Sequence, residues 1–281
     1  MAYLDKLIRA STEAKSLLCV GLDPNPDLIP TALKRAYPDP EQYVEQFCRE
    51  VIDATLETCC AYKPNLAFFE ALGSNGLSVF QRVLNHIPEG KIVISDAKRG
   101  DIGSTAAQYK RAFFDQFDTD ALTLNPMMGF DTLDPFIHSP EKAVYCLTLT
   151  SNPGSFDLLL RRFEGRLSLA EYIADQLRRK MKDSSTHIGM VVGATHDNDT
   201  VIRQVLNAYP DASLLIPGIG SQGGRTDLLA EQLKGHRGIP LVSSSRSIIY
   251  AGKDKKDWKT AVFEKAEETR KSLQSITERY V

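Results

Sequence analysis

The sequence has no long hydrophobic run and no strong excess of either charge. No apolar stretch approaches the roughly 18 residues that a membrane span needs. The first residues, Met-Ala-Tyr-Leu-Asp-Lys, lack the apolar segment of a secretory signal. The net charge is −2 over 281 residues, which gives no basis for binding nucleic acid or a membrane surface. We therefore expect neither kind of partner.

Cysteine and histidine are scarce and lack the spacings of structural or metal sites. The five cysteines contain no CxxC pair, and the five histidines contain no HxxxH or HxH pair. An odd number of cysteines without framework spacing is typical of reduced thiols. The sequence therefore predicts a cytoplasmic protein without a metal site.

What the sequence does contain is an alternation of short apolar runs with amphipathic stretches. Hydrophobic residues make up 42% of the chain and charged residues 25%, the balance of a globular protein. The apolar runs predict strands at 17–22, 61–65, 91–96, 121–124, 143–149, 187–192, 213–217 and 240–244. Helical spacing is found at 106–117, 167–181, 201–208 and 258–276.

Alternating strands and helices favour parallel pairing of the strands. Eight such units predict an α/β fold, a single-domain (β/α)8 TIM barrel over 1–281, with its active site at the C-terminal rim of the strands. An open doubly wound sheet is the alternative. Such a sheet is expected to carry a glycine-rich fingerprint after its first strand, and Gly21-Leu-Asp23-Pro does not match it.

The strongest chemical signal follows the third predicted strand, where the chain reads Asp96-Ala-Lys98-Arg-Gly-Asp101. Alternation along an extended backbone would place Asp96 and Lys98 on the same side. Two carboxylates flanking one ammonium are costly to assemble and commonly serve chemistry. A surface salt bridge at the end of a strand is the alternative interpretation.

Polar residues follow the other predicted strands as well. Asp23 follows the first strand, Lys63 and Asn65 end the second, Asn125 ends the fourth and Ser151 follows the fifth. In a barrel the C-terminal ends of all strands meet at one rim, where active sites are built. We expect these side chains to converge there.

The last two strands predict a phosphate site. Residues 217–224 read Pro-Gly-Ile-Gly-Ser-Gln-Gly-Gly, and four glycines allow backbone N–H groups to approach an anion closely. Arg246, after the eighth strand, offers a planar fork suited to phosphate. A flexible turn and a surface charge are the alternatives, but these two loops are the usual phosphate site of such barrels.

Together these motifs resemble the orotidine 5′-monophosphate decarboxylase family, most closely its longer bacterial form. The Asp-x-Lys-x-x-Asp element alone is shared with related phosphate-binding barrels, so the combination carries the specificity. The resemblance covers nearly the whole chain. Its segments are Asp96-Ala-Lys-Arg-Gly-Asp-Ile-Gly-Ser-Thr105, Lys63-Pro-Asn65, Thr150-Ser-Asn-Pro-Gly154, Gln222-Gly-Gly224 and Ser245-Arg-Ser-Ile248.

The resemblance implies a cofactor-independent carboxy-lyase that converts orotidine 5′-monophosphate to UMP and CO2, the last step of de novo pyrimidine biosynthesis. Lys98 would protonate C6, and Asp96 would lie against the substrate carboxylate. Lys63 and Asp101 would complete the catalytic array, with Asp101 entering from the partner of a homodimer. The substrate-binding residues would be Asp23, Ile102, Thr105, Ser151, Gln222, Gly223 and Arg246, of which Ile102 and Thr105 would come from the partner.

The residue chemistry agrees with this interpretation and disfavours three others. Negative charge left at C6 must be stabilised by fixed protein charge, which Lys98 can supply before delivering a proton. A metal-dependent sugar-phosphate decarboxylase or aldol synthase needs a carboxylate ligand where Lys63 stands. A Schiff-base aldolase needs an uncharged amine, which neighbouring carboxylates oppose. A non-catalytic phosphate-binding barrel would not need the charged cluster.

Overall fold

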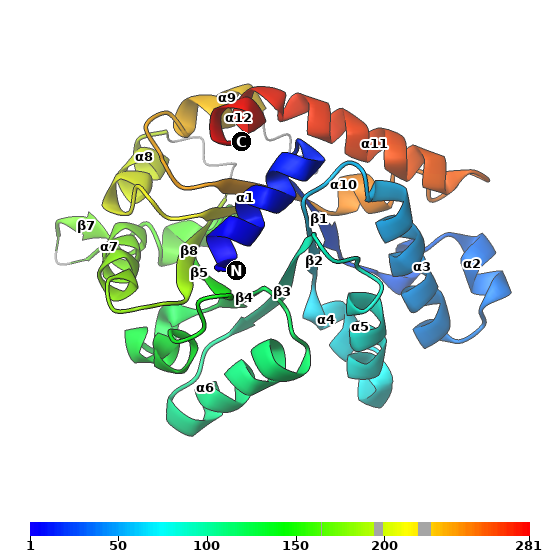
Figure 1. Ribbon diagram of the computed structural model, residues 1–281, viewed down its shortest axis with the longest axis horizontal. Helices are drawn as coiled ribbons and strands as arrows, with labels where there is room; N and C mark the ends of the chain where they lie inside the picture. Colours follow the sequence, from blue (N-terminus) through cyan, green and yellow to red (C-terminus); the bar gives the residue numbers. More distant parts are fainter. Residues whose placement is uncertain (164, 194–198, 219–225) are drawn as a thin grey trace.

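The computed structural model, which describes residues 1–163, 165–193, 199–218 and 226–281, contains a closed barrel of eight parallel strands (Figure 1). The eight predicted strands are confirmed, four of them with the predicted bounds, and the open sheet is excluded. Around the barrel the order is β1 (Leu18–Leu22), β10 (Pro240–Ser244), β9 (Leu214–Pro217), β8 (His187–Val192), β5 (Ala143–Leu149), β4 (Ala121–Leu124), β3 (Ile92–Arg99) and β2 (Ala61–Pro64).

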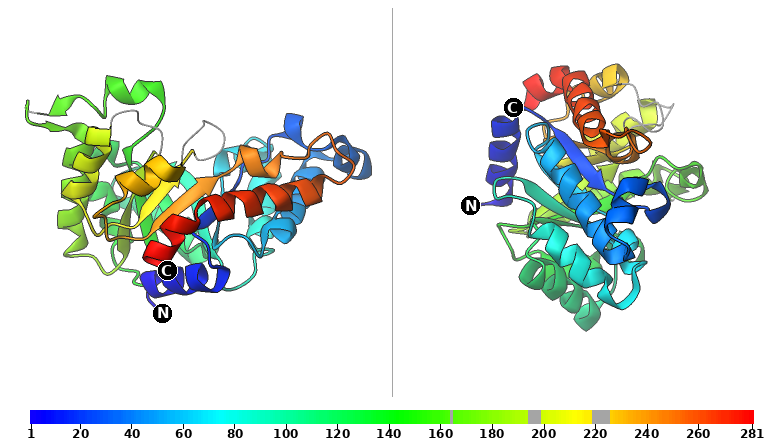
Figure 2. Two further views of the ribbon diagram at one scale, coloured as in Figure 1. Left: turned by 90° about the horizontal axis from the view of Figure 1, so that it is seen from above. Right: turned by 90° about the vertical axis from the view of Figure 1, so that its right-hand side faces the viewer.

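Helices surround the barrel, and one of them lies across its N-terminal end (Figures 1 and 2). That helix is α1 (Tyr3–Ala14), which the sequence analysis did not predict. The others are α2 (Thr31–Ala36), α3 (Pro40–Thr55), α4 (Leu66–Glu70), α5 (Gly76–Leu84), α6 (Gly103–Lys110), α7 (Leu169–Met181), α8 (Asp199–Ala208), α9 (Thr226–Gln232), α10 (Arg246–Ile249), α11 (Trp258–Ser272) and α12 (Gln274–Tyr280). No helix of the described ranges is long and apolar enough to cross a membrane.

Local sequence explains where the predicted helices begin and end. Helix α7 begins two residues later than predicted because Ser168 and Glu171 form a capping box, and residues 167–168 pair instead with β6 (Arg162–Phe163). The helix expected at 258–276 is interrupted at Leu273, which separates α11 from α12. The stripe expected at 106–117 continues beyond α6 as a π-helical turn, Arg111–Gln116.

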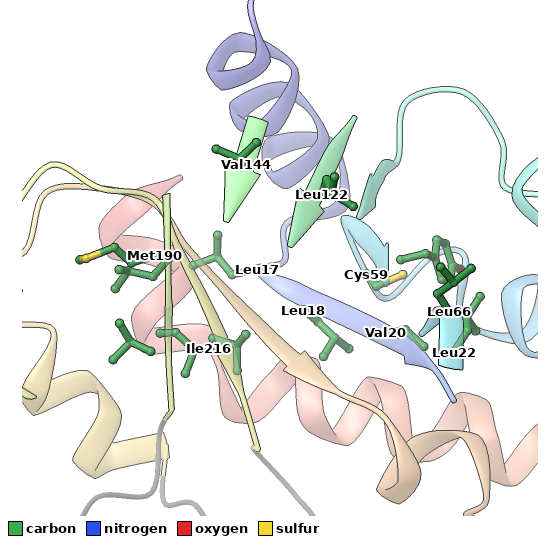
Figure 3. Close-up of a cluster of buried hydrophobic side chains, with 14 of the residues drawn as sticks. Leu17, Leu18, Val20, Leu22, Cys59, Leu66, Leu122, Val144, Met190 and Ile216 are labelled. Carbon is green, nitrogen blue, oxygen red and sulfur yellow. The ribbon is translucent and has the colours of Figure 1, made fainter. Parts of the chain in front are cut away.

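Side chains of the barrel strands alternate between two hydrophobic clusters. One cluster fills the barrel and includes Cys19, Ala61, Ile94 and Ala121. The other, which Figure 3 shows, lies between the strands and the helices. Successive side chains of a strand point to opposite faces. The next inward positions towards the C-terminal rim are those of Gly21 on β1, Asp23 directly after β1, Lys63 on β2, Asp96 on β3 and Thr123 on β4.

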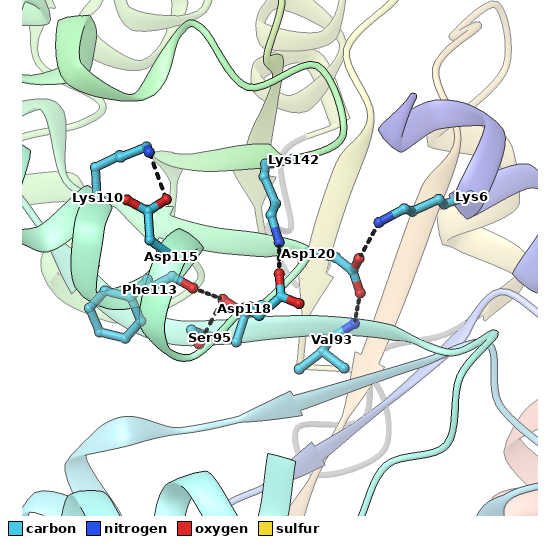
Figure 4. Close-up of polar contacts among 10 residues, drawn as sticks. Lys6, Val93, Ser95, Lys110, Phe113, Asp115, Asp118, Asp120 and Lys142 are labelled. Atoms are coloured by element: carbon cyan, nitrogen blue, oxygen red, sulfur yellow. Dashed lines mark hydrogen bonds and ion pairs between the residues drawn. The ribbon is translucent and has the colours of Figure 1, made fainter. Parts of the chain in front are cut away.

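The N-terminal end of β3 and β4 is held by paired charges (Figure 4). Asp120 accepts a hydrogen bond from Lys6 Nζ of α1 at 3.1 Å and another from the backbone N–H of Val93 at 2.9 Å. Lys142, which is buried, binds Asp118 at 2.5 Å. These contacts tie α1 and β5 to the β3–β4 pair at the end opposite the predicted site.

Candidate active site

Asp96 is the centre of a charged cluster at the C-terminal rim. Its Oδ2 accepts a hydrogen bond from Lys63 Nζ at 2.6 Å, and its Oδ1 accepts one from Lys98 Nζ at 2.5 Å. The hydroxyl of Thr123 lies 3.2 Å from the same Oδ1. The side chains of Lys63 and Asp96 are almost fully buried, whereas 49% of the Lys98 side chain is exposed. The predicted pairing of Lys63, Asp96 and Lys98 is therefore present.

The route by which Lys98 reaches Asp96 differs from the predicted one. Simple alternation along an extended strand does not apply, because Lys98 has a left-handed backbone with φ of 49°. The register between β3 and β4 also shifts between Ser95 and Arg99. A bulge therefore aims Lys98 back towards Asp96.

The cluster holds its charges through mutual attraction. Burial raises the pKa of the Asp96 carboxyl, but the ammonium groups of Lys63 and Lys98 outweigh burial and hold that pKa well below its usual range. Burial lowers the pKa of Lys63, but the carboxylates of Asp96 and Asp23 reverse this and raise it above its ordinary value. Both members of the buried pair are therefore charged at neutral pH.

A cavity of about 220 Å³ opens beside this cluster. The Oδ1 atom of Asp23 is buried at its wall without a hydrogen-bond partner among the described residues. No carboxylate of the described chain pairs with Arg246. The cavity is lined by Asp23, Lys63, Asn65, Asp96, Ser151, Pro217, Gly218, Ser243, Ser245 and Arg246. Within the described part of the chain, the cavity therefore offers one ligand a carboxylate oxygen without a partner, a guanidinium without an ion pair, and an ammonium–carboxylate pair.

Close packing brings the end of β1 and the loop that follows it against the residues after β10. A Cβ atom on Gly21 would lie 1.8 Å from Ser245 Oγ, so only glycine fits at that position. The hydroxyl of Tyr250 donates to the carbonyl of Asp23 and accepts from the N–H of Asn25, both at 2.6 Å. Tyr250 therefore fixes the loop that carries Asp23 to the segment that carries Arg246.

Two asparagines at the rim serve local structure. Asn65 Oδ1 accepts from the N–H of Ala67 at the start of α4. Asn125 Oδ1 accepts from the N–H of Met127 at 3.1 Å, and the backbone carbonyl of Asn125 packs against Gly100, where a Cβ would lie 2.4 Å away. Asn125 therefore caps a turn, and only Asn65 reaches the cavity.

The remaining predicted site residues lie apart from the cluster or outside the described residues. Asp101 accepts a hydrogen bond from the N–H of Ile102 and forms no ion pair with Lys98 within the described chain. Ile102 and Thr105 are exposed. Gln222 and Gly223 lie outside the described residues.

Sequence reasoning missed Thr123 and Tyr250. Thr123 was predicted only as part of a strand. Because it lies two residues after Ala121, which points into the barrel, its side chain points into the barrel as well, at the rim. Tyr250 lies 227 residues from Asp23 in the chain, and the two come into contact only because the barrel closes. Among the described residues, no group of three or more His, Cys, Asp and Glu side chains could hold a metal ion.

Comparison with known proteins finds one family over most of the chain. The family model described as orotidine 5′-phosphate decarboxylase / HUMPS matches residues 16–261. An orotidine 5′-phosphate decarboxylase of Dehalococcoides mccartyi strain CBDB1 is 38% identical over 284 residues, covering 100% of both chains.

Two solved structures are similar over nearly their whole length. One, from Toxoplasma gondii, was assigned as a candidate orotidine-monophosphate-decarboxylase and has a TM-score of 0.87 with 30% identity, covering 99% of this chain and 97% of that one. The OMP decarboxylase of Leishmania donovani has a TM-score of 0.79 with 32% identity, covering 99% of each chain.

Proposed function

The chain belongs to the orotidine 5′-phosphate decarboxylase / HUMPS family, and on that premise we propose that it converts orotidine 5′-monophosphate to UMP and CO2. This reaction is the last step of de novo UMP synthesis. The observation that carries the proposal is the Lys63–Asp96–Lys98 cluster at the wall of a cavity that is also lined by Arg246, which has no ion pair with any described residue.

In the proposed reaction the bond between C6 and the carboxylate breaks, CO2 leaves, and the electron pair stays on C6. The Lys98 ammonium, held at 2.5 Å from Asp96, would stabilise the negative charge that develops on C6. A preorganised charge stabilises the transition state without reorganising, and Lys98 then donates a proton from Nζ to C6. Water returns the proton to the Lys98 amine.

The cavity suggests how the substrate is oriented. The free Oδ1 of Asp23 and the ammonium of Lys63 are suited to ribose hydroxyl groups, and Ser151 to the pyrimidine ring. Arg246 would bind the phosphate, together with Gln222 and Gly223 as the resemblance implies. Binding energy gained at the phosphate is then available to hold C6 against Lys98.

We further propose that the active unit is a homodimer in which Asp101, Ile102 and Thr105 complete the partner's site. Within one chain Asp101 forms no ion pair with the cluster, although it follows Lys98 by three residues. The adjoining surface carries exposed apolar side chains: Ile102 is 51% exposed, Met127 52% and Met128 58%. Exposed apolar groups gathered at one rim are typical of an interface.

The activity is tested by incubating the protein with orotidine 5′-monophosphate in excess EDTA and following the loss of pyrimidine absorbance. We expect the rate in EDTA to equal the rate without it, with one UMP formed per substrate consumed. Activity that EDTA abolishes and Mg²⁺ restores would indicate the metal-dependent relatives. A protein that binds UMP but releases no CO2 would be a phosphate-binding barrel.

The shared site is tested by mixing two inactive variants, Lys98→Ala and Asp101→Ala, under conditions where subunits exchange. In a heterodimer one site carries both changes and the other carries neither, so activity should return to about half of the sites in that species. If mass measurement verifies exchange and no activity returns, Asp101 acts within its own subunit.

A further inference from the structure

A three-residue bulge in β3 carries the reactive groups, and a single threonine faces it. Ser95 pairs with Leu122 and Arg99 pairs with Leu124, so residues 96–98 of β3 stand opposite Thr123 alone. A bulge of this kind leaves backbone N–H groups without their strand partners and redirects side chains. Another acceptor must therefore satisfy the N–H groups of Ala97 and Lys98.

The Thr123 hydroxyl is that acceptor. Its Oγ1 accepts from the N–H of Ala97 at 3.0 Å and from the N–H of Lys98 at 2.9 Å. A hydroxyl has two acceptor sites and one proton. With both acceptor sites in use, the proton is donated to Asp96 Oδ1, 3.2 Å away. Thr123 is 1% exposed, so water does not compete for these bonds.

The bulge also contains the strained backbone of the site. Lys98 has φ of 49°, a conformation that side chains with a Cβ adopt only when their surroundings enforce it. The hydrogen bond from the Lys98 N–H to Thr123 is a contact that enforces it from the neighbouring strand. The same hydroxyl orients the carboxylate that binds Lys98 Nζ.

We propose that Thr123 is a positioning residue for decarboxylation: its hydroxyl holds the β3 bulge and the Asp96 carboxylate together, and thereby places Lys98 Nζ. The expected loss of kcat in Thr123 variants rests on the proposed function. The expected loosening of the bulge does not, because the bulge and its hydrogen bonds exist without substrate.

Three variants separate the hydroxyl from the rest of the side chain. Thr123→Val keeps the shape and removes the hydroxyl, and Thr123→Ser keeps the hydroxyl. Thr148→Val is the matched control, because Thr148 is a fully buried threonine of the adjacent strand β5 whose hydroxyl, among the described residues, donates to the carbonyl of Cys146 at 3.0 Å and to no other group. The thermal unfolding midpoint of each variant shows whether the variant is folded under the assay conditions.

We expect Thr123→Val to lower kcat by about 10- to 100-fold with KM changed less than about threefold, because displacement of a reacting group by about 1 Å can cost 10²-fold. Thr123→Ser and Thr148→Val should keep kcat within about threefold of the wild type. Amide hydrogen exchange at Ala97 and Lys98 should accelerate about tenfold or more in Thr123→Val alone, because those N–H groups lose their acceptor.

Wild-type kcat in Thr123→Val would overturn the proposal, as would unchanged exchange at both amides. Equal losses in Thr148→Val would overturn it too, because they would reflect general loosening of the barrel. If the wild-type protein itself does not decarboxylate the substrate, the proposed function fails, while the exchange measurement still decides whether Thr123 holds the bulge.

Discussion

Among the described residues, one polar network lies at each end of the barrel interior, and the two networks differ in charge and in closure. At the C-terminal rim, Lys63, Asp96 and Lys98 form an ionic cluster beside an open cavity. At the N-terminal end a neutral chain of hydrogen bonds joins Tyr3, Tyr145, Ser213 and His187, with contacts of 2.9, 3.2 and 2.7 Å in that order.

The neutral network satisfies its own groups and is closed by helix α1. The ring of Tyr3, which is fully buried, stacks on His187 with centroids 6.0 Å apart. In contrast, the ionic cluster borders a cavity where Asp23 Oδ1 has no described partner. A closed and satisfied network stabilises the fold, whereas an open one leaves groups available to a ligand. We therefore expect the network at the N-terminal end to stabilise the fold and the cluster at the C-terminal rim to serve the chemistry.

The largest combined loss of stability and activity is expected for a change at Asp96. Asp96→Asn leaves the buried Lys63 ammonium without its nearest anion, and breaking a buried ion pair typically costs about 3–5 kcal/mol of unfolding free energy. We also expect kcat to fall by about 10³-fold, since the Lys98 ammonium loses the carboxylate charge that holds it in place. Urea unfolding and steady-state kinetics measure the two losses.

Asp120→Asn is the matched control for this change at the other end. Its partner Lys6 is one-third exposed, and such pairs are worth about 1 kcal/mol or less. Equal losses of stability and activity in the two variants would show that an ion pair at the C-terminal rim has no role beyond that of one at the N-terminal end.

Arg246→Ala should weaken catalysis through the phosphate. The guanidinium lines the cavity without a described anionic partner, and a charge-assisted contact of this kind is worth about 2–4 kcal/mol in kcat/KM. Orotidine, which lacks the phosphate, is the control substrate: both proteins should turn it over equally slowly. A variant that loses activity on orotidine as much as on the monophosphate would show that Arg246 does not act on the phosphate.

The neutral network should be the acid-sensitive one. Burial lowers the pKa of His187 from 6.5 to about 4. Between these values the unfolded chain binds a proton that the folded protein does not, so stability is lost as the pH falls from 6.5 to 4. At about 1.36 kcal/mol per pH unit the loss approaches about 3 kcal/mol.

His187→Gln isolates this contribution, because glutamine can still bond Ser213 but does not titrate. The difference in unfolding free energy between wild type and variant, measured from pH 8 to pH 4, should shift in favour of the variant below pH 6.5. A constant difference across that range would show that His187 does not control acid stability. In the ionic cluster the pKa of Asp96 is held well below its usual range, so this cluster should persist over the same interval.

The smallest expected effect concerns Tyr250, which fixes the loop that carries Asp23 to the segment that carries Arg246. Tyr250→Phe removes hydrogen bonds to Asp23 and Asn25 but keeps the ring stacked on Phe47. We expect about 1 kcal/mol lower stability and about a fivefold lower kcat/KM. Tyr209→Phe, which loses one bond to the carbonyl of Ile188, should match the stability loss without the kinetic one. Identical kinetics in the two variants would contradict a role for Tyr250 at the site.

Much of the fold was predictable because the strands are short apolar runs bounded by turn residues. The strands 121–124 and 143–149 were predicted with their observed bounds for this reason. Helix α1 was not predicted, because its buried face consists of only Tyr3, Leu7 and Ala10. These side chains are buried only because the helix covers the end of the barrel.

The site was predictable where one strand carries neighbouring charges, and not where distant segments meet. Asp96 and Lys98 lie two residues apart, so their pairing was predicted, although the bulge that achieves it was not. Thr123 and Tyr250 contact the site from segments whose proximity depends on closure of the sheet. The partner contribution of Asp101 stays a prediction.

The most direct measurement compares one variant from each network, Lys98→Ala and Tyr145→Phe, for kcat and for the thermal unfolding midpoint. Lys98 is half exposed, so its variant should lose at least about 10⁴-fold in kcat, from lost charge stabilisation and proton donation, and keep its unfolding midpoint. Tyr145→Phe breaks the neutral network and should lower the midpoint by a few degrees while kcat stays within about twofold. Near-normal kcat in Lys98→Ala, or a loss of kcat in Tyr145→Phe as large as in Lys98→Ala, would contradict the assignment of chemistry to the ionic end of the barrel.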